Sequence, residues 1–307
     1  MISSFFSKTK PIHLVVVSIL LLVVFVVAKI FTIHEPLSLE LFGKQSAFFI
    51  IVWLSLFTLD FFVSKNNLTK KNSYKILMFA LFIAVLPESI LNSRLLLSNF
   101  FVLLALRRII SLRSQKEIKK KLFDAAFWVS IASLLHFWAS LFFLLIFAAM
   151  ILYSIRSIKN WIVPFVGVLT VAIITTSLMM VFNIDYQNYA SELIGYSFDF
   201  TQLNSVRIIM ATTILISYGT WASFFFIKHI KNKSKSYRPS FVLIIITSIL
   251  ALMIIVVSQN KTGSEFIFLF APLSIIMTNY LEVTEEKWFK EILIWVLILI
   301  PLVSLML

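Results

Sequence analysis

Cysteine is absent from this chain of 307 residues. Without thiols there can be no disulfide framework, no thiolate nucleophile and no zinc site of the cysteine type. The sequence also lacks a phosphate-binding glycine-rich loop, a serine nucleophile elbow and a dinucleotide-binding fingerprint. These absences argue against ATP hydrolysis by this chain.

Charge and glycine are scarce as well. Only 13% of the residues are charged and 60% are hydrophobic, whereas soluble domains average about 25% and about 45–50%. Of five glycines, essentially Gly167 and Gly219 fall within apolar segments, without the matched interruptions that coupled transporters show in their two halves. The composition indicates lipid as the main solvent and disfavours a coupled transporter.

The apolar residues are concentrated in eleven stretches of near-spanning length, against the roughly 20 residues that a membrane span needs. They predict an all-α integral membrane protein, a polytopic bundle of about 11 helices (10–12) in a single transmembrane domain, 1–307. The stretches are 13–33, 46–64, 74–90, 92–112, 122–136, 138–155, 161–182, 207–227, 240–258, 265–280 and 292–307.

The basic residues predict the orientation of this bundle. If Lys8 and Lys10 lie in the cytoplasm, 22 of the 27 basic residues fall on that side, as the positive-inside rule requires. Most of them lie in the loops 65–75, 107–121, 156–159 and 228–239. The net charge of +13 is thus explained by topology, and we predict no nucleic-acid partner.

The same count predicts a break inside 122–155. One long crossing there would export the basic loop at 228–238, so we expect two short helices with a hinge near His136 to Trp138. The outer side then holds the loops 34–45 and 183–206, which carry acidic and aromatic residues suited to a membrane interface.

Histidine offers no metal centre of the iron-oxygenase type. His13 and His229 are expected near the inner face and His34 and His136 near the outer face, separated by roughly 30 Å of hydrocarbon. A pair of His34 and His136 with a carboxylate stays an alternative. We predict no metal and no cofactor.

Two arginines are exceptions to the predicted concentration of basic residues on the cytoplasmic side. Arg94 and Arg207 are expected at the outer face, each near the amino terminus of a helix, where the macrodipole disfavours a cation. Each needs an anion, and Asn92 and Asn204 stand where a capping residue would help to form a phosphate site. The alternatives are an ordinary phospholipid headgroup or a protein carboxylate, so substrate binding by these four residues is a hypothesis.

Glu88 is the strongest acid–base candidate, because it follows Pro87 at a helical bend where backbone hydrogen bonds are broken. The alternative is that it neutralises Arg94. Glu265 opens a helix and suits its dipole, which explains it without catalysis. Asp60 and Asp124 lie near inner helix ends close to lysines, which favours ion pairing over a proton relay.

Four segments carry a resemblance: Met1–Phe6, Leu91–Arg94, Ala105–Arg113 and Lys121–Trp128. Through them the whole chain resembles a family of multi-pass inner-membrane proteins from flavobacteria and related Bacteroidota with no established activity. The resemblance implies the bacterial inner membrane and assigns no role to any residue. A looser likeness to enzymes that use polyprenyl-phosphate sugars rests on helix count, acidic outer loops and outward arginines alone.

Three functional hypotheses follow. The first is an outer-face enzyme of the cell envelope that transfers or polymerises a glycan from a polyprenyl-phosphate-linked substrate, held by the two arginines with Glu88 as base. The second is a non-catalytic component of an envelope assembly or export complex that binds other envelope proteins through its loops. The third is a transporter or lipid flippase in which the arginines select an anion. Membrane lipids are expected partners in all three.

Overall fold

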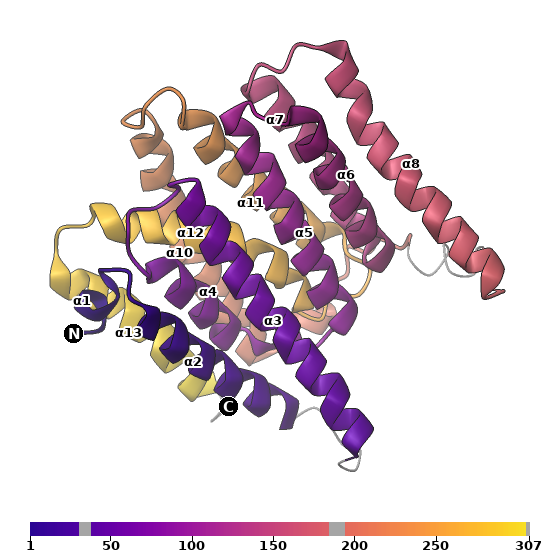
Figure 1. Ribbon diagram of the computed structural model, residues 1–307. Helices are drawn as coiled ribbons and strands as arrows, with labels where there is room; N and C mark the ends of the chain where they lie inside the picture. The colour runs from indigo at the N-terminus through magenta and orange to yellow at the C-terminus, as the bar shows by residue number, and fades with distance from the viewer. Residues whose placement is uncertain (31–37, 184–193, 305–307) are drawn as a thin grey trace.

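Helices account for nearly all of the regular structure in the computed structural model, which describes residues 1–30, 38–183 and 194–304 (Figure 1). The α-helices are α1 (Ile2–Phe6), α2 (Pro11–Ile30), α3 (Leu39–Lys65), α4 (Tyr74–Val85), α5 (Ser93–Ser111), α6 (Ile118–Leu135), α7 (Phe142–Leu152), α8 (Ile158–Val181), α10 (Val206–Ile230), α11 (Arg238–Val257), α12 (Ile267–Val283) and α13 (Lys287–Ser304). Short 3₁₀ helices are η1 (Pro87–Ile90), η2 (Leu112–Ser114), η3 (Phe137–Leu141), η4 (Thr201–Leu203) and η5 (Ser264–Phe266). Each predicted apolar stretch contains a helix.

Seven helical segments are long and apolar enough to cross a membrane, which identifies a membrane protein of the all-helical class. Two further apolar segments, Tyr74–Val85 and Phe137–Leu152, are shorter. The seven segments are Pro11–Ile30, Leu39–Lys65, Ser93–Ser114, Ile158–Val181, Val206–Ile230, Arg238–Val257 and Ser264–Val283.

Some loops differ from the prediction at their ends. The expected outer loop 34–45 ends earlier, because α3 begins at Leu39, where the Ser38 side chain accepts a hydrogen bond from the Leu41 amide. Glu40 then falls in the first turn, where the helix dipole favours a carboxylate. His34 and Glu35 lie outside the described residues.

The basic loops shorten for the same reason, since the flanking helices continue into them. Within 107–121, α5 runs to Ser111 and α6 begins at Ile118, and within 228–239, α10 runs to Ile230. In the loop 183–206, Asp185 and Glu192 lie outside the described residues.

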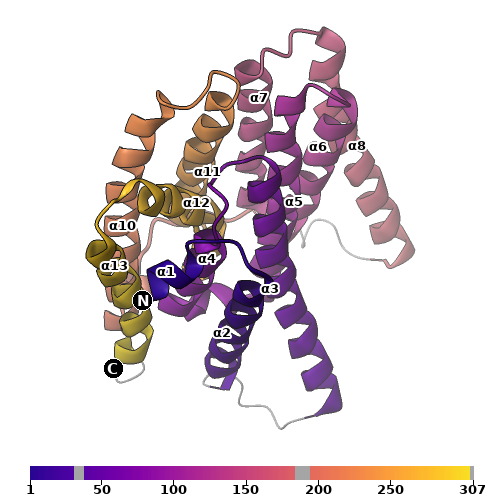
Figure 2. The same ribbon diagram turned by 60° about the vertical axis from the view of Figure 1, so that its left-hand side comes forward.

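Two helices form the centre of the bundle. Every residue of α4 is buried, and α12 is buried over nearly all of its length, because each packs against several neighbours (Figure 2). Polar groups at this depth bond to backbone: Asn279 donates to the carbonyls of Leu68 and Ile275 at 2.9 Å each. Water is absent from hydrocarbon, so such internal partners are what stabilise a buried amide.

The predicted break near His136 is confirmed. α6 ends at Leu135, His136 is extended (φ −148°, ψ 106°), and η3 and α7 follow. Tyr153, just past the end of α7, accepts a hydrogen bond on its carbonyl from Gln115 Nε2 at 3.0 Å. Since Gln115 precedes α6, α7 returns to the level where α6 began, and the two helices form an antiparallel hairpin.

The periphery is apolar on its outer surface. α8 packs mainly on α6, and a Cβ at Gly167 would lie 2.9 Å from Ala126 Cβ, so the glycine permits this close approach. The opposite face of α8 exposes large apolar side chains such as Phe165 (62%) and Leu169 (61%). Lipid is the solvent that suits this surface.

One end of the bundle collects the basic loops. There Asp60 pairs with Lys75 Nζ at 3.0 Å and Asp124 with Arg108 Nη2 at 2.8 Å. Both aspartates therefore form ion pairs, as their positions near helix ends predict. The partner of Asp60 lies on the following helix, α4, and the partner of Asp124 lies on the preceding helix, α5.

Candidate functional site

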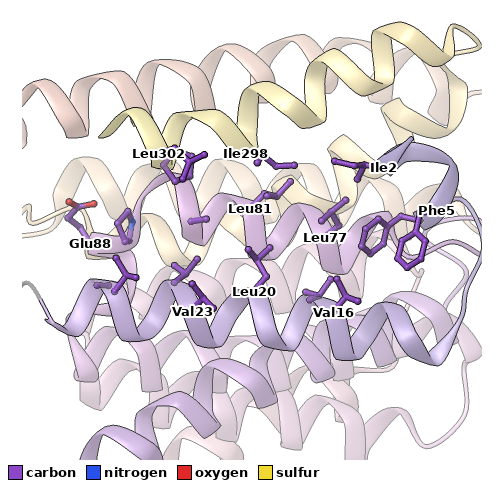
Figure 3. A pocket seen from close by; sticks show the side chains of 18 of the residues that line it. Ile2, Phe5, Val16, Leu20, Val23, Leu77, Leu81, Glu88, Ile298 and Leu302 are labelled. Atoms are coloured by element: carbon purple, nitrogen blue, oxygen red, sulfur yellow. The ribbon is translucent and has the colours of Figure 1, made fainter. Parts of the chain in front are cut away.

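A groove of about 710 Å³ lies between α2 and α13, with α4 as its floor (Figure 3). Both flanking helices pack on α4. The lining side chains from α2 and α4 recur at helical spacing, so each helix turns one apolar stripe toward the groove. These residues are Val16, Val17, Leu20, Val23, Val24, Val27 and Ala28 from α2, and Leu77, Leu81 and Ala84 from α4. Ile298, Pro301 and Leu302 of α13 form the other wall.

One end of the groove is closed by α1. Ile2 and Phe5 line that end, opposite to Glu88 (Figure 3). The short helix is tied to α13 by Glu291, which accepts hydrogen bonds from the Ser3 amide at 2.8 Å and the Ser3 hydroxyl at 2.7 Å. Tyr74 of α4 donates to the Ser3 carbonyl at 2.6 Å. The end of the groove near the basic loops is therefore a fixed part of the fold.

The other end of the groove is polar. Glu88 and Arg207 are the charged side chains among the residues that line it. Arg207 Nε lies 3.3 Å from Glu88 Oε1, without the angle of a hydrogen bond, and the second carboxylate oxygen of Glu88 is buried with no hydrogen-bond partner in the described part of the chain. The pair is thus under-satisfied although its two side chains are 32% and 17% exposed, and an unsatisfied polar group of this kind needs an explanation.

Local backbone structure places Glu88. Pro87 cannot continue α4, and the residue before it, Leu86, leaves the helical region (φ −129°, ψ 76°). The chain enters η1, and the Ser264 hydroxyl donates to the Glu88 carbonyl at 2.8 Å. The neighbouring residue Gly263 has φ +88° and permits this close approach, because a Cβ there would lie only 3.3 Å from Glu88 Cβ.

Arg207 is placed by the start of α10. It is the second residue of that helix, and its side chain is about a third exposed. The cap is Ser205, whose hydroxyl accepts from the Ile208 amide at 3.2 Å. Of the Asn–Ser pair that precedes the helix, the serine is therefore the cap, whereas Asn204 follows the end of η4 and is exposed.

The other arginine stays apart from the groove. Asn92 does cap α5, accepting from the amides of Arg94 at 3.0 Å and Leu95 at 3.3 Å, but Arg94 is exposed and is not among the lining residues. The carboxylate expected to neutralise Arg94, that of Glu88, pairs with Arg207 instead. The structure thus brings together Glu88 and Arg207, and leaves Asn92, Arg94 and Asn204 outside the groove.

Lys29, which sequence reasoning missed, lies at the same end. Ala28 lines the groove, and the next residue, Lys29, donates from Nζ to the carbonyl of Leu91, another lining residue, at 3.4 Å. In the sequence, Lys29 is a single cation at the end of an apolar run, and that pattern also describes an ordinary interfacial lysine.

The described part of the outer loop 183–206 is held by a buried cation. Lys261 Nζ donates to the carbonyls of Ser197 and Ser258 and lies 4.7 Å from the centre of the Phe200 ring. Burial lowers the pKa of Lys261, because an ammonium is less well solvated there than in water. This lysine fixes the loop against the end of α11.

Two other acidic residues of this end, Glu265 and Asp199, have structural partners. Glu265 accepts from the backbone amides of Gly263 at 3.0 Å and Thr262 at 3.4 Å, as expected for a capping carboxylate. Asp199 accepts from the Thr201 amide at 2.9 Å, and this hydrogen bond lowers the pKa of Asp199. Within the described residues, no three histidine, aspartate or glutamate side chains form a group that could hold a metal ion.

Comparison with known proteins identifies a family. The profile of a family of unknown function, DUF6427, matches residues 7–306. No curated protein and no solved structure matches the chain. The chain, an all-helical membrane protein with an apolar groove that ends at Glu88 and Arg207, therefore belongs to the DUF6427 family, whose function is unknown.

Proposed function

We propose that this protein binds a lipid with one long apolar chain and a phosphate headgroup at the outer face of the bacterial inner membrane. The observation that carries the proposal is the groove itself, which is apolar along its walls and ends at an arginine. The apolar chain lies in the groove between α2 and α13, and the phosphate lies against Arg207.

The proposed orientation follows from the charges. The basic loops meet at the end of the bundle that α1 occupies, so this end is cytoplasmic by the positive-inside rule. In this arrangement the chain crosses the membrane eleven times, with the amino terminus inside. The Glu88 end of the groove then opens at the outer face.

The dimensions and shape of the groove favour a single chain. Its α2 wall extends from Val16 to Ala28, about 18 Å at 1.5 Å per residue, more than half of the roughly 30 Å hydrocarbon core. Its floor is one stripe of α4, Leu77, Leu81 and Ala84, and is therefore one side chain wide. A polyprenyl chain has this linear form.

The polar end suits a phosphate. A guanidinium donates in a fork that matches phosphate oxygens, and the start of α10 adds a positive dipole end and unpaired amides. Glu88 is the only carboxylate among the lining residues, which makes it the candidate base for taking a proton from an acceptor hydroxyl. In this proposal the reaction class is transfer of an envelope glycan from its lipid carrier.

The other two hypotheses receive less support. A flippase needs a polar path for the headgroup across the membrane, but the groove walls between α1 and Glu88 are apolar. A scaffold that binds envelope proteins through its loops gives no reason for a groove that ends at an under-satisfied ion pair.

The test is native mass spectrometry of the purified protein in mild detergent. Wild type should retain a single-chain lipid phosphate. Arg207→Gln should lose it by removing the phosphate contact, and Ala84→Phe should lose it by filling the floor of the groove. Leu169→Phe on the exposed face of α8 adds the same kind of bulk outside the groove and should retain the lipid.

The opposite result is equally clear. If only bulk phospholipid is retained, in equal amounts by wild type and both groove variants, the groove is an ordinary lipid-facing surface and the proposal fails. Arg207→Gln serves as the second variant if Ala84→Phe does not fold, since the Arg207 side chain is partly exposed.

A further inference from the structure

A second cavity, of about 150 Å³, lies at the basic end of the bundle and shares no lining residue with the groove. It lies where α10 and α12 end and α11 begins, and these three helices pack on one another (Figure 2). The chain that follows α3 also reaches it, since Lys70 is among the lining residues. Because the apolar segments of α10 and α12 end at Ile230 and Val283, the cavity lies at the level of lipid headgroups.

One wall of the cavity is aromatic. The rings of Phe225 and Tyr280 have centres 5.1 Å apart, and those of Phe226 and Phe241 have centres 5.4 Å apart. The Tyr280 hydroxyl accepts a hydrogen bond from Trp221 Nε1 at 2.8 Å. These contacts fix the wall before any ligand binds, so little side-chain entropy remains to be lost on binding.

The other lining residues carry an excess of positive charge. Lys70 and Lys233 line the cavity together with one carboxylate, that of Glu282. Both ammonium groups act electrostatically on this carboxylate, which places both charges near it. Glu282 Oε1 already accepts hydrogen bonds from the Lys70 amide at 2.7 Å and from Asn72 Nδ2 at 2.6 Å. Neither ammonium group forms an ion pair in the described part of the chain, so the cavity has cationic donors available.

Two of these polar residues are restrained beside the aromatic wall. Lys233 Nζ lies 4.8 Å from the centre of the Phe241 ring, a cation–π contact. His229 Nδ1 lies 2.8 Å from the Phe225 carbonyl oxygen, and it is the donor because a carbonyl only accepts. The other ring nitrogen, Nε2, can donate to an anion when the imidazole is protonated. The cavity thus combines an apolar wall with donors that suit a phosphate.

We propose that this cavity binds the phosphate of an anionic phospholipid from the leaflet at the basic end of the bundle. Lys70 and Lys233 contact the phosphate, and the aromatic wall packs against the glycerol. Basic pockets between membrane helices on the cytoplasmic side are typical sites for anionic headgroups. A soluble phosphate compound offers the same chemistry, but the position at the ends of two membrane helices favours a lipid. This site is separate from the groove and does not rest on the proposed function.

Phosphatidylglycerol and phosphatidylcholine with the same acyl chains serve as probes, added to the detergent-purified full chain and measured by native mass spectrometry. Wild type should bind phosphatidylglycerol at least about tenfold more tightly, the range for one charge-assisted contact. The double variant Lys70→Gln, Lys233→Gln should lose this preference. Asn232→Trp should also weaken binding of phosphatidylglycerol, because it adds bulk at an exposed lining position without changing the charge.

The double variant Lys71→Gln, Lys231→Gln is the matched control. It removes the same two charges from exposed lysines of the same two segments that do not line the cavity, and it should keep the preference. A preference that survives Lys70→Gln, Lys233→Gln, or one that the control loses equally, overturns the proposal, since binding would then follow total charge. If glycerol phosphate binds wild type as tightly as phosphatidylglycerol, the ligand is a soluble phosphate compound and the lipid assignment is overturned.

Discussion

The two ends of the bundle use charge in different ways. At the basic end, the 22 basic residues assigned to that side are spread over the loops and the adjoining helix ends, and the described ion pairs there, such as Asp60 with Lys75, join neighbouring helices. At the opposite end cations are few, and Arg207, Lys29 and Lys261 each have a specific contact with backbone, ring or carboxylate. The difference suggests two uses of charge: many basic residues together predict the orientation in the membrane, whereas a few cations at the other end each make a specific contact.

The largest expected effect concerns the side of the membrane on which each end of the bundle lies. Because the chain has no cysteine, single cysteines can be introduced without background. In intact cells a membrane-impermeant maleimide should label Gln202→Cys, on η4, and should not label Ser236→Cys, in the loop before α11. Permeabilisation should make both react. The reverse pattern would place the groove mouth in the cytoplasm and remove the basis for an outer-face function.

The next largest effect is a difference in thermal stability between variants that break an ion pair at one end of the bundle or at the other. Asp60→Asn leaves the Lys75 ammonium, whose side chain is 2% exposed, without its carboxylate and should cost about 2–3 kcal/mol, less than a fully buried pair because Asp60 is a third exposed. Arg207→Gln should change thermal stability little, since that pair is under-satisfied already. Melting curves in one detergent measure both, with the exposed Lys71→Gln as control. Equal losses for the two variants would mean that the Arg207 pair is structural.

A smaller effect tests what Glu88 does. Glu88→Gln removes the charge that competes for Arg207 and should strengthen binding of a lipid phosphate by a few-fold. If Glu88 is also the base, the same variant should lose transfer activity, so that affinity and turnover change in opposite directions. Native mass spectrometry of the purified protein in mild detergent measures whether the affinity for the lipid phosphate rises. A weaker affinity would show that the carboxylate supports the arginine instead of competing with it.

The smallest effect is local. Lys261→Met removes the donor that holds the carbonyls of Ser197 and Ser258 and should increase hydrogen exchange in residues 194–200. Exchange in α4 should stay at its wild-type level, because that helix is buried at the centre. Unchanged exchange at 194–200 would show that the contacts of Trp138 with Gly195 are sufficient to hold the loop.

Much of the fold could be predicted because hydropathy is a local property. An apolar run predicts a helix from the local sequence alone, and each of the eleven stretches contains a helix, of which seven helical segments are long and apolar enough to cross a membrane. Helix starts were less accurate, as at Leu39 and Val206, because a cap depends on which of several adjacent polar side chains turns back to an amide. The hinge at His136 was predicted from distant loops, since a single crossing would have placed the basic loop at 228–238 on the outer side of the membrane.

The site could be predicted only in part. Glu88 and Arg207 stand out in the sequence, one after a proline bend and one against the charge pattern, yet nothing in the sequence pairs them across 119 positions. Arg94, which was equally plausible from the sequence, is exposed and is not among the residues that line the groove, and only the packing of the helices decides this.

The sequence by itself determined that the chain is helical, that lipid surrounds it and that its charges are divided between two ends. Only the tertiary structure decided which apolar face of α2 lines the groove and which faces lipid. Both environments favour apolar side chains, so the helical pattern in the sequence does not distinguish the two faces. The same holds for Lys29, whose contact with the carbonyl of Leu91 joins two residues that are 62 positions apart in the sequence. Contacts between distant helices are set by packing, and packing is decided by the whole bundle.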